Sequence, residues 1–193
     1  MYYNKTAVIP ETSPIWKIDV SRMDLEEGGF SLVASELNFD KLWAYQGAFL
    51  SLDYSTRLAH IQKTATVIAG STTTKTRVSK NNLFNIGDVV GKTGANAVAI
   101  TAIDTSNDDY DVLTHLTNGA ALSAGDVLIE AAAVGSDAAA KYTVDGLLND
   151  TTRLRGTPSV TAKVTGFPYI KTDNLSYPIT DAIKSDLSHF RFI

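Results

Sequence analysis

The chain has 193 residues and a formal net charge of −4, and it contains no cysteine. The absence of cysteine excludes disulfides, thiolate metal sites and a cysteine nucleophile. The 17 basic residues are scattered, so no basic face for nucleic acid is expected, and no apolar stretch approaches the roughly 20 residues of a membrane helix. The length suits one domain with extensions, or two very small domains.

Residues 1–60 are predicted to form an extended N-terminal arm with a docking region. They hold both tryptophans and four of the eight tyrosines. Residues 16–20 alternate apolar and charged side chains as a half-buried strand does, and residues 47–53 are a second strand candidate. The aromatic residues of this region belong either to a core or to an interface, where aromatic residues are enriched. The candidate interface residues are Trp16, Phe39, Trp43, Tyr45 and Phe49.

Residues 61–166 are rich in Thr, Val, Ala and Gly, and short apolar runs alternate with turn residues. This composition predicts a nearly all-β domain. Residues 64–69 and 75–78 flank Gly70 and predict a hairpin, and further strands are expected at 97–103, 110–116 and 159–164. Residues 131–140 are Ala-rich and favour a helical turn, although Gly135 interrupts them.

A Gly-Asp-Val sequence occurs twice in this β region, beginning at Gly87 and at Gly125. Glycine tolerates positive φ, and an aspartate carboxylate can accept hydrogen bonds from nearby backbone N–H groups. Apolar residues suited to a strand follow both copies. We therefore predict two similar turns, each leading into a strand.

Residues 167–193 are predicted to form a C-terminal extension with a short amphipathic helix. Ile179, Ile183, Leu187 and Phe190 recur at helical spacing, and Pro178 suits a first helical turn. A helix this short is marginal alone, so it either closes the β domain or docks on a neighbour. Ile183, Leu187 and Phe190 are therefore further interface candidates.

The sequence contains no motif of a catalytic, cofactor or metal site, and we expect a protein that is not an enzyme and binds no cofactor. The acidic segment 104–111 lacks the Gly and Glu that a calcium loop needs at its sixth and twelfth positions. His60, His115 and His189 lie far apart and form no ligand pair. A Gly-x-Ser-x-Gly nucleophile turn, a Walker loop and a Gly-x-Gly-x-x-Gly turn are all absent.

These patterns together predict a mainly β fold. The expected architecture is a compact β-barrel or β-clip-like domain with an extended N-terminal arm and a short C-terminal helix. The first residues, Met1 to Thr6, lack the apolar core of a signal peptide, so we expect synthesis and use in a cytoplasm.

Several segments of the β region resemble virion proteins of tailed phages, most closely head fibre and head decoration proteins. They are residues 64–67, 72–74, 77–90, 100–104 and 125–128, with a weaker likeness at 178–192. The resemblance implies a non-enzymatic homo-oligomer, in that family often a trimer, whose partner is the major capsid protein or another virion protein. It places the protein in the virion, assembled in the host cytoplasm. The short chain lacks collagen-like repeats, which favours a compact knob or clamp over a long shaft.

We expect residues 2–49 to supply most of the contact with the capsid or another subunit. Deletion of residues 1–50 should then abolish particle association and leave the β domain folded. Two alternatives stay open. A carbohydrate- or host-receptor-binding module needs an exposed aromatic platform, for which Tyr110, Tyr142 and Tyr169 are candidates. A virion-associated polysaccharide hydrolase needs two close carboxylates in a concave site and a perturbed pKa.

Overall fold

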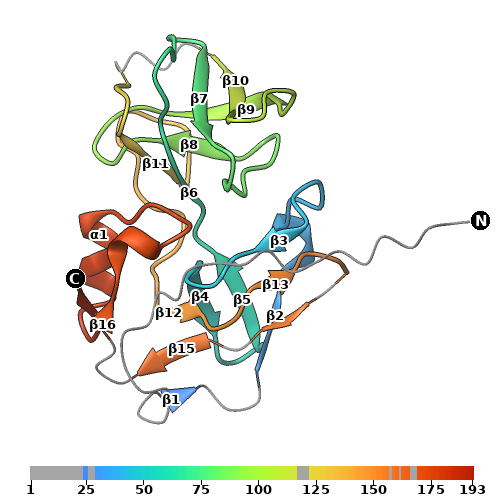
Figure 1. Cartoon of the computed structure of the whole chain (residues 1–193), viewed down its shortest axis with the longest axis vertical. Coiled ribbons are helices and arrows are strands. Elements are labelled where there is room, and N and C mark those ends of the chain that lie inside the picture. Colours follow the sequence, from blue (N-terminus) through green and yellow to red (C-terminus); the bar gives the residue numbers. More distant parts are fainter. Residues whose placement is uncertain (1–23, 26–28, 117–121, 157, 161, 166–168) are drawn as a thin grey trace, which may run out of the picture.

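The computed structural model describes residues 24–25, 29–116, 122–156, 158–160, 162–165 and 169–193. Its strands form a lower half built on a seven-stranded sheet and an upper half built on a curled six-stranded sheet (Figure 1). One short helix, α1 (Asp181–Asp186), lies beside the lower half. The predicted mainly β class with a short C-terminal helix is confirmed. The strand predicted at residues 16–20 lies outside the described residues.

The seven-stranded sheet has the order β1-β15-β12-β4-β5-β2-β14, so it combines segments from both ends of the chain. Neighbouring strands in this sheet are antiparallel, except for the parallel pair β2 and β5. Its strands are β1 (Asp24–Leu25), β2 (Phe30–Leu32), β4 (Phe49–Asp53), β5 (Leu58–Ile61), β12 (Gly146–Leu148), β14 (Ser159–Val160) and β15 (Ala162–Thr165).

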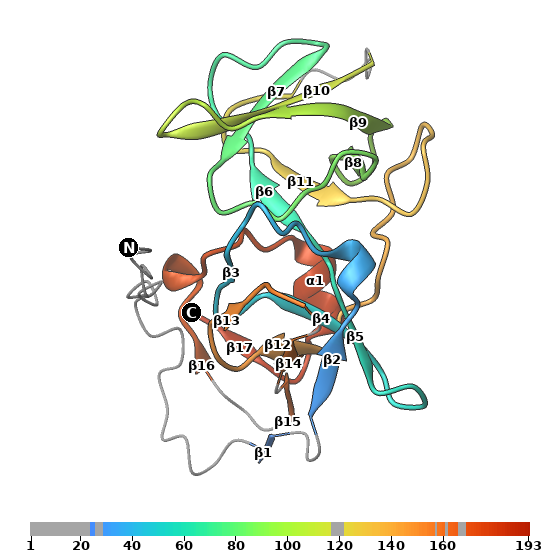
Figure 2. The same ribbon diagram turned by 90° about the vertical axis from the view of Figure 1, so that its right-hand side faces the viewer.

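The six-stranded sheet has the order β6-β11-β8-β9-β10-β7 and curls into a half-barrel (Figure 2). Its two edge strands meet at a single bridge between Val67 and Val78. The Ile68 N–H donates to the Arg77 carbonyl at 2.8 Å, so the predicted hairpin around Gly70 closes this edge. The strands are β6 (Thr64–Thr66), β7 (Lys75–Ser79), β8 (Val89–Gly91), β9 (Ala97–Asp104), β10 (Tyr110–His115) and β11 (Val127–Glu130).

Short elements complete the fold around the lower half. They are the antiparallel pair β3 (Trp43–Ala44) and β13 (Thr152–Arg153), the parallel pair β16 (Tyr169–Ile170) and β17 (Arg191–Phe192), and the 3-10 turns η2 (Ala34–Glu36) and η3 (Thr172–Asn174).

Strand pairing divides the chain differently from the predicted boundaries at residues 60 and 166. Residues 30–61 are not an arm, because β2, β4 and β5 lie within the seven-stranded sheet. Residues 64–130 build the upper half, and β12 returns the chain to the lower sheet beside β4. The backbone groups of β4 need partners on both sides, and these come from β5 and β12. Deletion of residues 1–50 would remove β2 and the first residues of β4, so the structure gives reason to expect that the remainder would not keep this fold.

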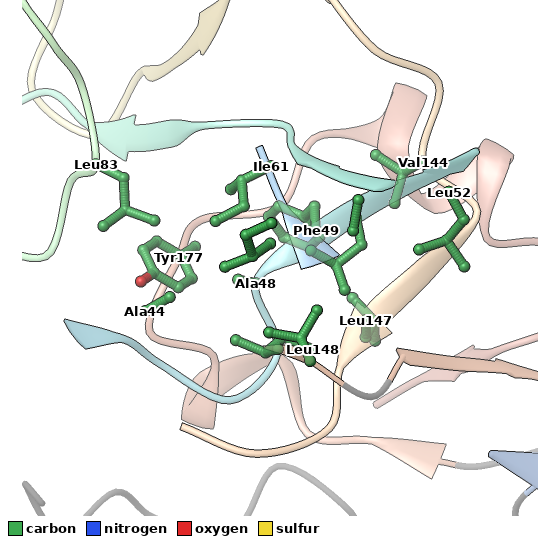
Figure 3. Close-up of a cluster of buried hydrophobic side chains, with 14 of the residues drawn as sticks. Ala44, Ala48, Phe49, Leu52, Ile61, Leu83, Val144, Leu147, Leu148 and Tyr177 are labelled. Atoms are coloured by element: carbon green, nitrogen blue, oxygen red, sulfur yellow. The ribbon is translucent and has the colours of Figure 1, made fainter. Parts of the chain in front are cut away.

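Each half has its own apolar core. The lower core includes Phe49, Leu147 and Tyr177, which come from β4, β12 and the segment before α1 (Figure 3). The upper core includes Phe84 and Leu113, neither of which is exposed to solvent. The two clusters are separate, and each includes side chains from outside the strands of its sheet, such as Leu83 in the lower core and Phe84 in the upper core.

The two Gly-Asp turns have the same geometry, as predicted. Gly87 and Gly125 have φ values of 94° and 91°, the region that favours glycine. In each turn the aspartate carboxylate accepts the N–H of the residue three positions earlier. These bonds run from Asn85 to Asp88 at 2.7 Å and from Ser123 to Asp126 at 2.8 Å. The turns lead into β8 and β11, which pair with each other.

The helical predictions were only partly right. Helix α1 begins at Asp181, and the Thr180 hydroxyl caps it by accepting the Ile183 N–H at 3.3 Å. Residues 131–140 form no helical turn, because bridges from Ala131 to Ala140 and from Ala138 to Thr93 tie them to neighbouring segments. Among the described residues, no helix has the length and apolar character needed to cross a membrane.

Candidate functional site

The C-terminal interface candidates and one of the aromatic candidates are buried within their own chain. Phe49, Ile183, Leu187 and Phe190 belong to the lower core, and none is more than 5% exposed. While this fold persists, these side chains are unavailable to another chain. Of the two alternatives for the C-terminal helix, the structure therefore favours the one in which it closes the β fold.

The remaining aromatic candidates differ in exposure, and Trp16 lies outside the described residues. Trp43 and Tyr45 are half-buried, and the Tyr45 N–H donates to the Tyr177 hydroxyl at 3.0 Å. Phe39 is 49% exposed. Among the described candidates, Phe39 is therefore the side chain that another molecule can reach most readily.

Phe39 lines two open grooves. One groove runs between the halves and includes Leu37, Ile86 and Ile103. The other lies beside β13 and includes Leu42 and Leu154. Selected exposed side chains of the two grooves form a candidate surface, which we call the Phe39 surface. It comprises Phe39, Leu42, Ile86, Arg153 and Arg155. The exposed Ser35, Asp40 and Thr105 also line the first groove, so one carboxylate lies beside this surface.

The Phe39 surface combines apolar side chains with positive charge. Leu42 and Ile86 are 52% and 65% exposed. Arg153 and Arg155 are also exposed, and no carboxylate within the described part of the chain pairs with either one. Arginine is weakly hydrated and can bind carboxylates through two N–H groups, so it is common in interfaces. The surface therefore suits a partner that offers apolar side chains and carboxylates.

The walls of the groove between the halves are held by hydrogen bonds across it. The Asn38 amide donates to the Phe84 carbonyl at 2.5 Å, and the Asn85 amide donates to the Glu36 carbonyl at 3.0 Å. Asn38 and Glu36 belong to the lower half, whereas Phe84 and Asn85 belong to the upper half. These bonds fix Phe39 and Ile86 relative to each other before any partner binds.

The three tyrosines considered for a carbohydrate platform come from the upper half, the junction and the lower half. Each ring packs against another side chain of the same chain, which occupies part of the surface that a sugar would need. The contacts are Arg77 with Tyr110 (4.7 Å to the ring centroid), His60 with Tyr142 (4.7 Å between centroids) and Arg191 with Tyr169 (5.8 Å to the centroid).

The chain passes between the two halves at a junction (Figure 1). A partly buried polar cluster lies there. We call it the junction cluster. It comprises Glu36, His60, Lys63, Asp88, Glu130, Lys141 and Tyr142.

Lys63 and Glu130 form the deepest part of the junction cluster, at 3% and 1% exposure. The Lys63 Nζ lies 2.7 Å from Asp88 Oδ2 and 3.6 Å from Glu130 Oε2. Lys141 Nζ donates to the other Glu130 oxygen at 2.8 Å. Burial raises the pKa of Glu130 even though Lys63 and Lys141 act to lower it. The group is thus a buried carboxyl that holds a proton more readily than an exposed glutamate.

Glu36 forms the outer part of the junction cluster. His60 Nδ1 lies 3.0 Å from its carboxylate, and the Tyr142 hydroxyl donates to it. Burial and the bond to Glu36 raise the pKa of Tyr142 to about 12, so the phenol stays protonated as the donor. These contacts connect the lower half to the segment that returns from β11.

Sequence reasoning did not identify Lys63, Asp88 and Glu130 as a group. Asp88 was recognised only as a turn residue, and Lys63 and Glu130 were not singled out. The available signal was weak: Glu130 interrupts the apolar run 127–133, and Lys63 lies between the apolar strand patterns of β5 and β6. A charged residue inside such a pattern is a candidate for a buried, paired charge.

The histidines have separate local roles. His60 contacts Glu36, and His115 Nε2 lies 2.8 Å from the Thr76 hydroxyl. Within the described ranges, no group of three or more His, Asp or Glu side chains is placed to hold a metal ion.

No protein-family model, curated protein or solved structure matches this chain. The roles of its residues therefore rest on the contacts described above.

Proposed function

We propose that the chain is a non-enzymatic structural protein of a phage particle, a head fibre or decoration protein that binds the capsid through the Phe39 surface. The resemblance of residues 64–67 and 77–90 to tailed-phage virion proteins supports the class of partner. The observation that supports a capsid contact at this place is the Phe39 surface itself, where exposed apolar side chains adjoin Arg153 and Arg155. The partner surface offers apolar side chains and carboxylates.

The rigidity of the groove supports binding without prior rearrangement. The bonds from Asn38 and Asn85 hold the two walls in place, so little conformational entropy is lost when Phe39 is covered. A capsid attachment protein benefits from such preorganisation because the capsid lattice also has a fixed shape.

The size of the surface favours attachment by several copies together. Complete burial of a large apolar side chain contributes about 1.5–3 kcal/mol. Phe39, Leu42 and Ile86 are already partly buried, at 49%, 52% and 65% exposure. One copy therefore gains only a few kcal/mol from these side chains. A homo-oligomer binds more firmly because its later contacts become intramolecular. A homo-oligomer, with a trimer as the form that the resemblance implies, is part of the proposal.

The test is co-sedimentation of the purified chain with empty capsids from the phage that encodes it. We expect the native chain to bind and a Phe39→Ala/Arg153→Ala double variant to bind at least tenfold more weakly, as is typical when interface anchors are truncated. A Leu116→Ala/Val134→Ala variant removes two exposed apolar side chains outside this surface and should bind normally.

The outcomes separate the parts of the proposal. Failure of the native chain to sediment with capsids would overturn the virion role. Normal binding by the Phe39→Ala/Arg153→Ala variant would instead overturn the assignment of the surface. Light scattering with size exclusion measures the oligomer, and a monomeric mass at working concentration would contradict the multivalent attachment.

A further inference from the structure

Three neighbouring strands bring a lysine, an aspartate and a glutamate together in the junction cluster. Lys63 directly precedes β6, Asp88 directly precedes β8, and Glu130 ends β11, which lies between β6 and β8. The Glu130 N–H donates to the Lys63 carbonyl at 2.9 Å, which fixes the register of these two residues. The Lys63 amine is thereby held 2.7 Å from one Asp88 carboxyl oxygen and 3.6 Å from Glu130 Oε2.

The three groups are shielded from solvent. The side chains of Lys63, Asp88 and Glu130 are 2%, 13% and 2% exposed. Burial excludes most water from the site, which disfavours hydrolysis of a bond formed between two of these groups. Glu130 Oε2 is buried and accepts no hydrogen bond from the described residues. It is therefore free to exchange a proton with Lys63.

We propose that Lys63 and Asp88 join spontaneously in an intramolecular isopeptide bond, with Glu130 as the group that transfers protons. Glu130 accepts a proton from the Lys63 ammonium and passes it to the Asp88 carboxylate, so that the ion pair becomes a neutral amine and a carboxylic acid. The amine attacks the Asp88 Cγ atom and the Nζ–Cγ bond forms. Glu130 then accepts the second proton from the attacking nitrogen and gives it to the departing hydroxyl as the C–O bond breaks. One water molecule leaves, Glu130 returns to its starting state, and no oxidant or reductant takes part.

Two further contacts suit this condensation. The Asn85 N–H donates to Asp88 Oδ2 at 2.7 Å, so a fixed donor lies where negative charge develops during attack. Asp88 also lines the groove between the halves, which gives the released water a path to solvent. The product joins the chain at the starts of β6 and β8, on either side of β11, in addition to the hydrogen bonds of the sheet.

The first experiment is the intact mass of the native full-length chain, after incubation at neutral and at mildly acidic pH. We expect a mass lower than that of the sequence by one water. Tryptic digestion should give a branched species that joins residues 58–75 to residues 81–92, with no cleavage after Lys63. A native chain that keeps the full sequence mass at both pH values would overturn the proposal, whether or not any variant folds.

Variants assign the roles. Lys63→Arg and Glu130→Gln should both show the full sequence mass, because the first lacks the nucleophile and the second lacks the proton-transfer group. Asp88→Asn should lose ammonia in place of water, which is a signature of attack at this side chain. Lys92→Arg is the control, because Lys92 lies outside the junction cluster and pairs with Asp126 at 2.8 Å, and it should still lose water.

Contrary results in these variants are informative. Loss of water by Lys63→Arg would overturn the choice of nucleophile, and loss of water by Glu130→Gln would overturn the role of Glu130. Circular dichroism of each variant shows whether it has folded. If Glu130→Gln does not fold, the mass of the native chain still tests whether the bond forms. These results do not depend on capsid binding, so they test the bond separately from the proposed function.

Discussion

Gly87 shows how a single residue determines a turn in this protein. Its φ of 94° is strained for any residue with a Cβ atom, although nothing lies within 4 Å of the position where that atom would be. We expect Gly87→Ala to lower the free energy of unfolding by about 1–2 kcal/mol, through backbone strain alone. Urea denaturation monitored by circular dichroism measures this loss.

Gly135 provides a matched control for that substitution. It also has open space around its Cα, but its φ is outside the left-handed region. Gly135→Ala should change the free energy of unfolding by less than about 0.5 kcal/mol. Equal losses in the two variants would show that the φ of Gly87 is not the cause.

The environment of the Asp111 carboxylate leads us to expect that the free energy of unfolding depends on pH. Asp111 is fully buried, and burial acts to raise its pKa, but hydrogen bonds from Lys41, Lys80 and Asn82 outweigh this and hold the pKa below its usual range. Its contribution to stability is therefore present above the unfolded pKa of about 4, and it is lost as the pH falls towards the lowered pKa of the folded state. We expect Asp111→Asn to cost about 3 kcal/mol at neutral pH, because two lysines lose their partner.

The pH profile separates this loss of charge from a general packing defect. The native chain should lose stability below about pH 4 more steeply than Asp111→Asn does, because the variant has no carboxylate to protonate there. Asp108→Asn changes an exposed aspartate and should follow the native profile. Parallel native and Asp111→Asn profiles would contradict the role assigned to Asp111.

At the scale of the elements, helix α1 depends on packing. It has six residues, too few to be stable alone, and Leu187 at its C-cap has 0% exposure in the lower core. We expect Leu187→Ala to cost about 3 kcal/mol through lost burial and the cavity left behind. Ser188→Ala, at the exposed next position, should change stability little. Thermal unfolding measures both, and an unchanged Leu187→Ala would show that α1 is not part of the core.

The elements that sequence patterns identified are those with strong local signals. The alternation at residues 110–116 and the apolar run at 97–103 predicted β10 and β9. The face of β10 that is buried, however, is that of Asp111, Leu113 and His115, and β9 has no single buried face. Residues 131–140 misled the prediction, because alanine favours a helix locally whereas backbone bridges to neighbouring segments decided the outcome. The parallel pairing of β2 with β5 had no local signal at all.

At the scale of the whole molecule, the lower sheet depends on strands from the first 53 residues. Deletion of residues 1–50 removes β1, β2, β3 and the first residues of β4, so the seven-stranded sheet should not form. We expect the shortened chain to show a weaker β spectrum by circular dichroism than the full chain. A folded, cooperative chain after this deletion would contradict the sheet topology.

The sequence by itself determined the mainly β class, the two Gly-Asp turns and the strands that follow them. These features depend on the backbone preferences of neighbouring residues, which a short stretch of sequence contains. Only the tertiary structure decided that Phe49 is core whereas Phe39 is exposed, since burial depends on pairing between β4 and β12, far apart in the chain. The same long-range pairing brought Lys63 to Glu130, because sheet order, and not local sequence, determines which charged side chains share a buried site.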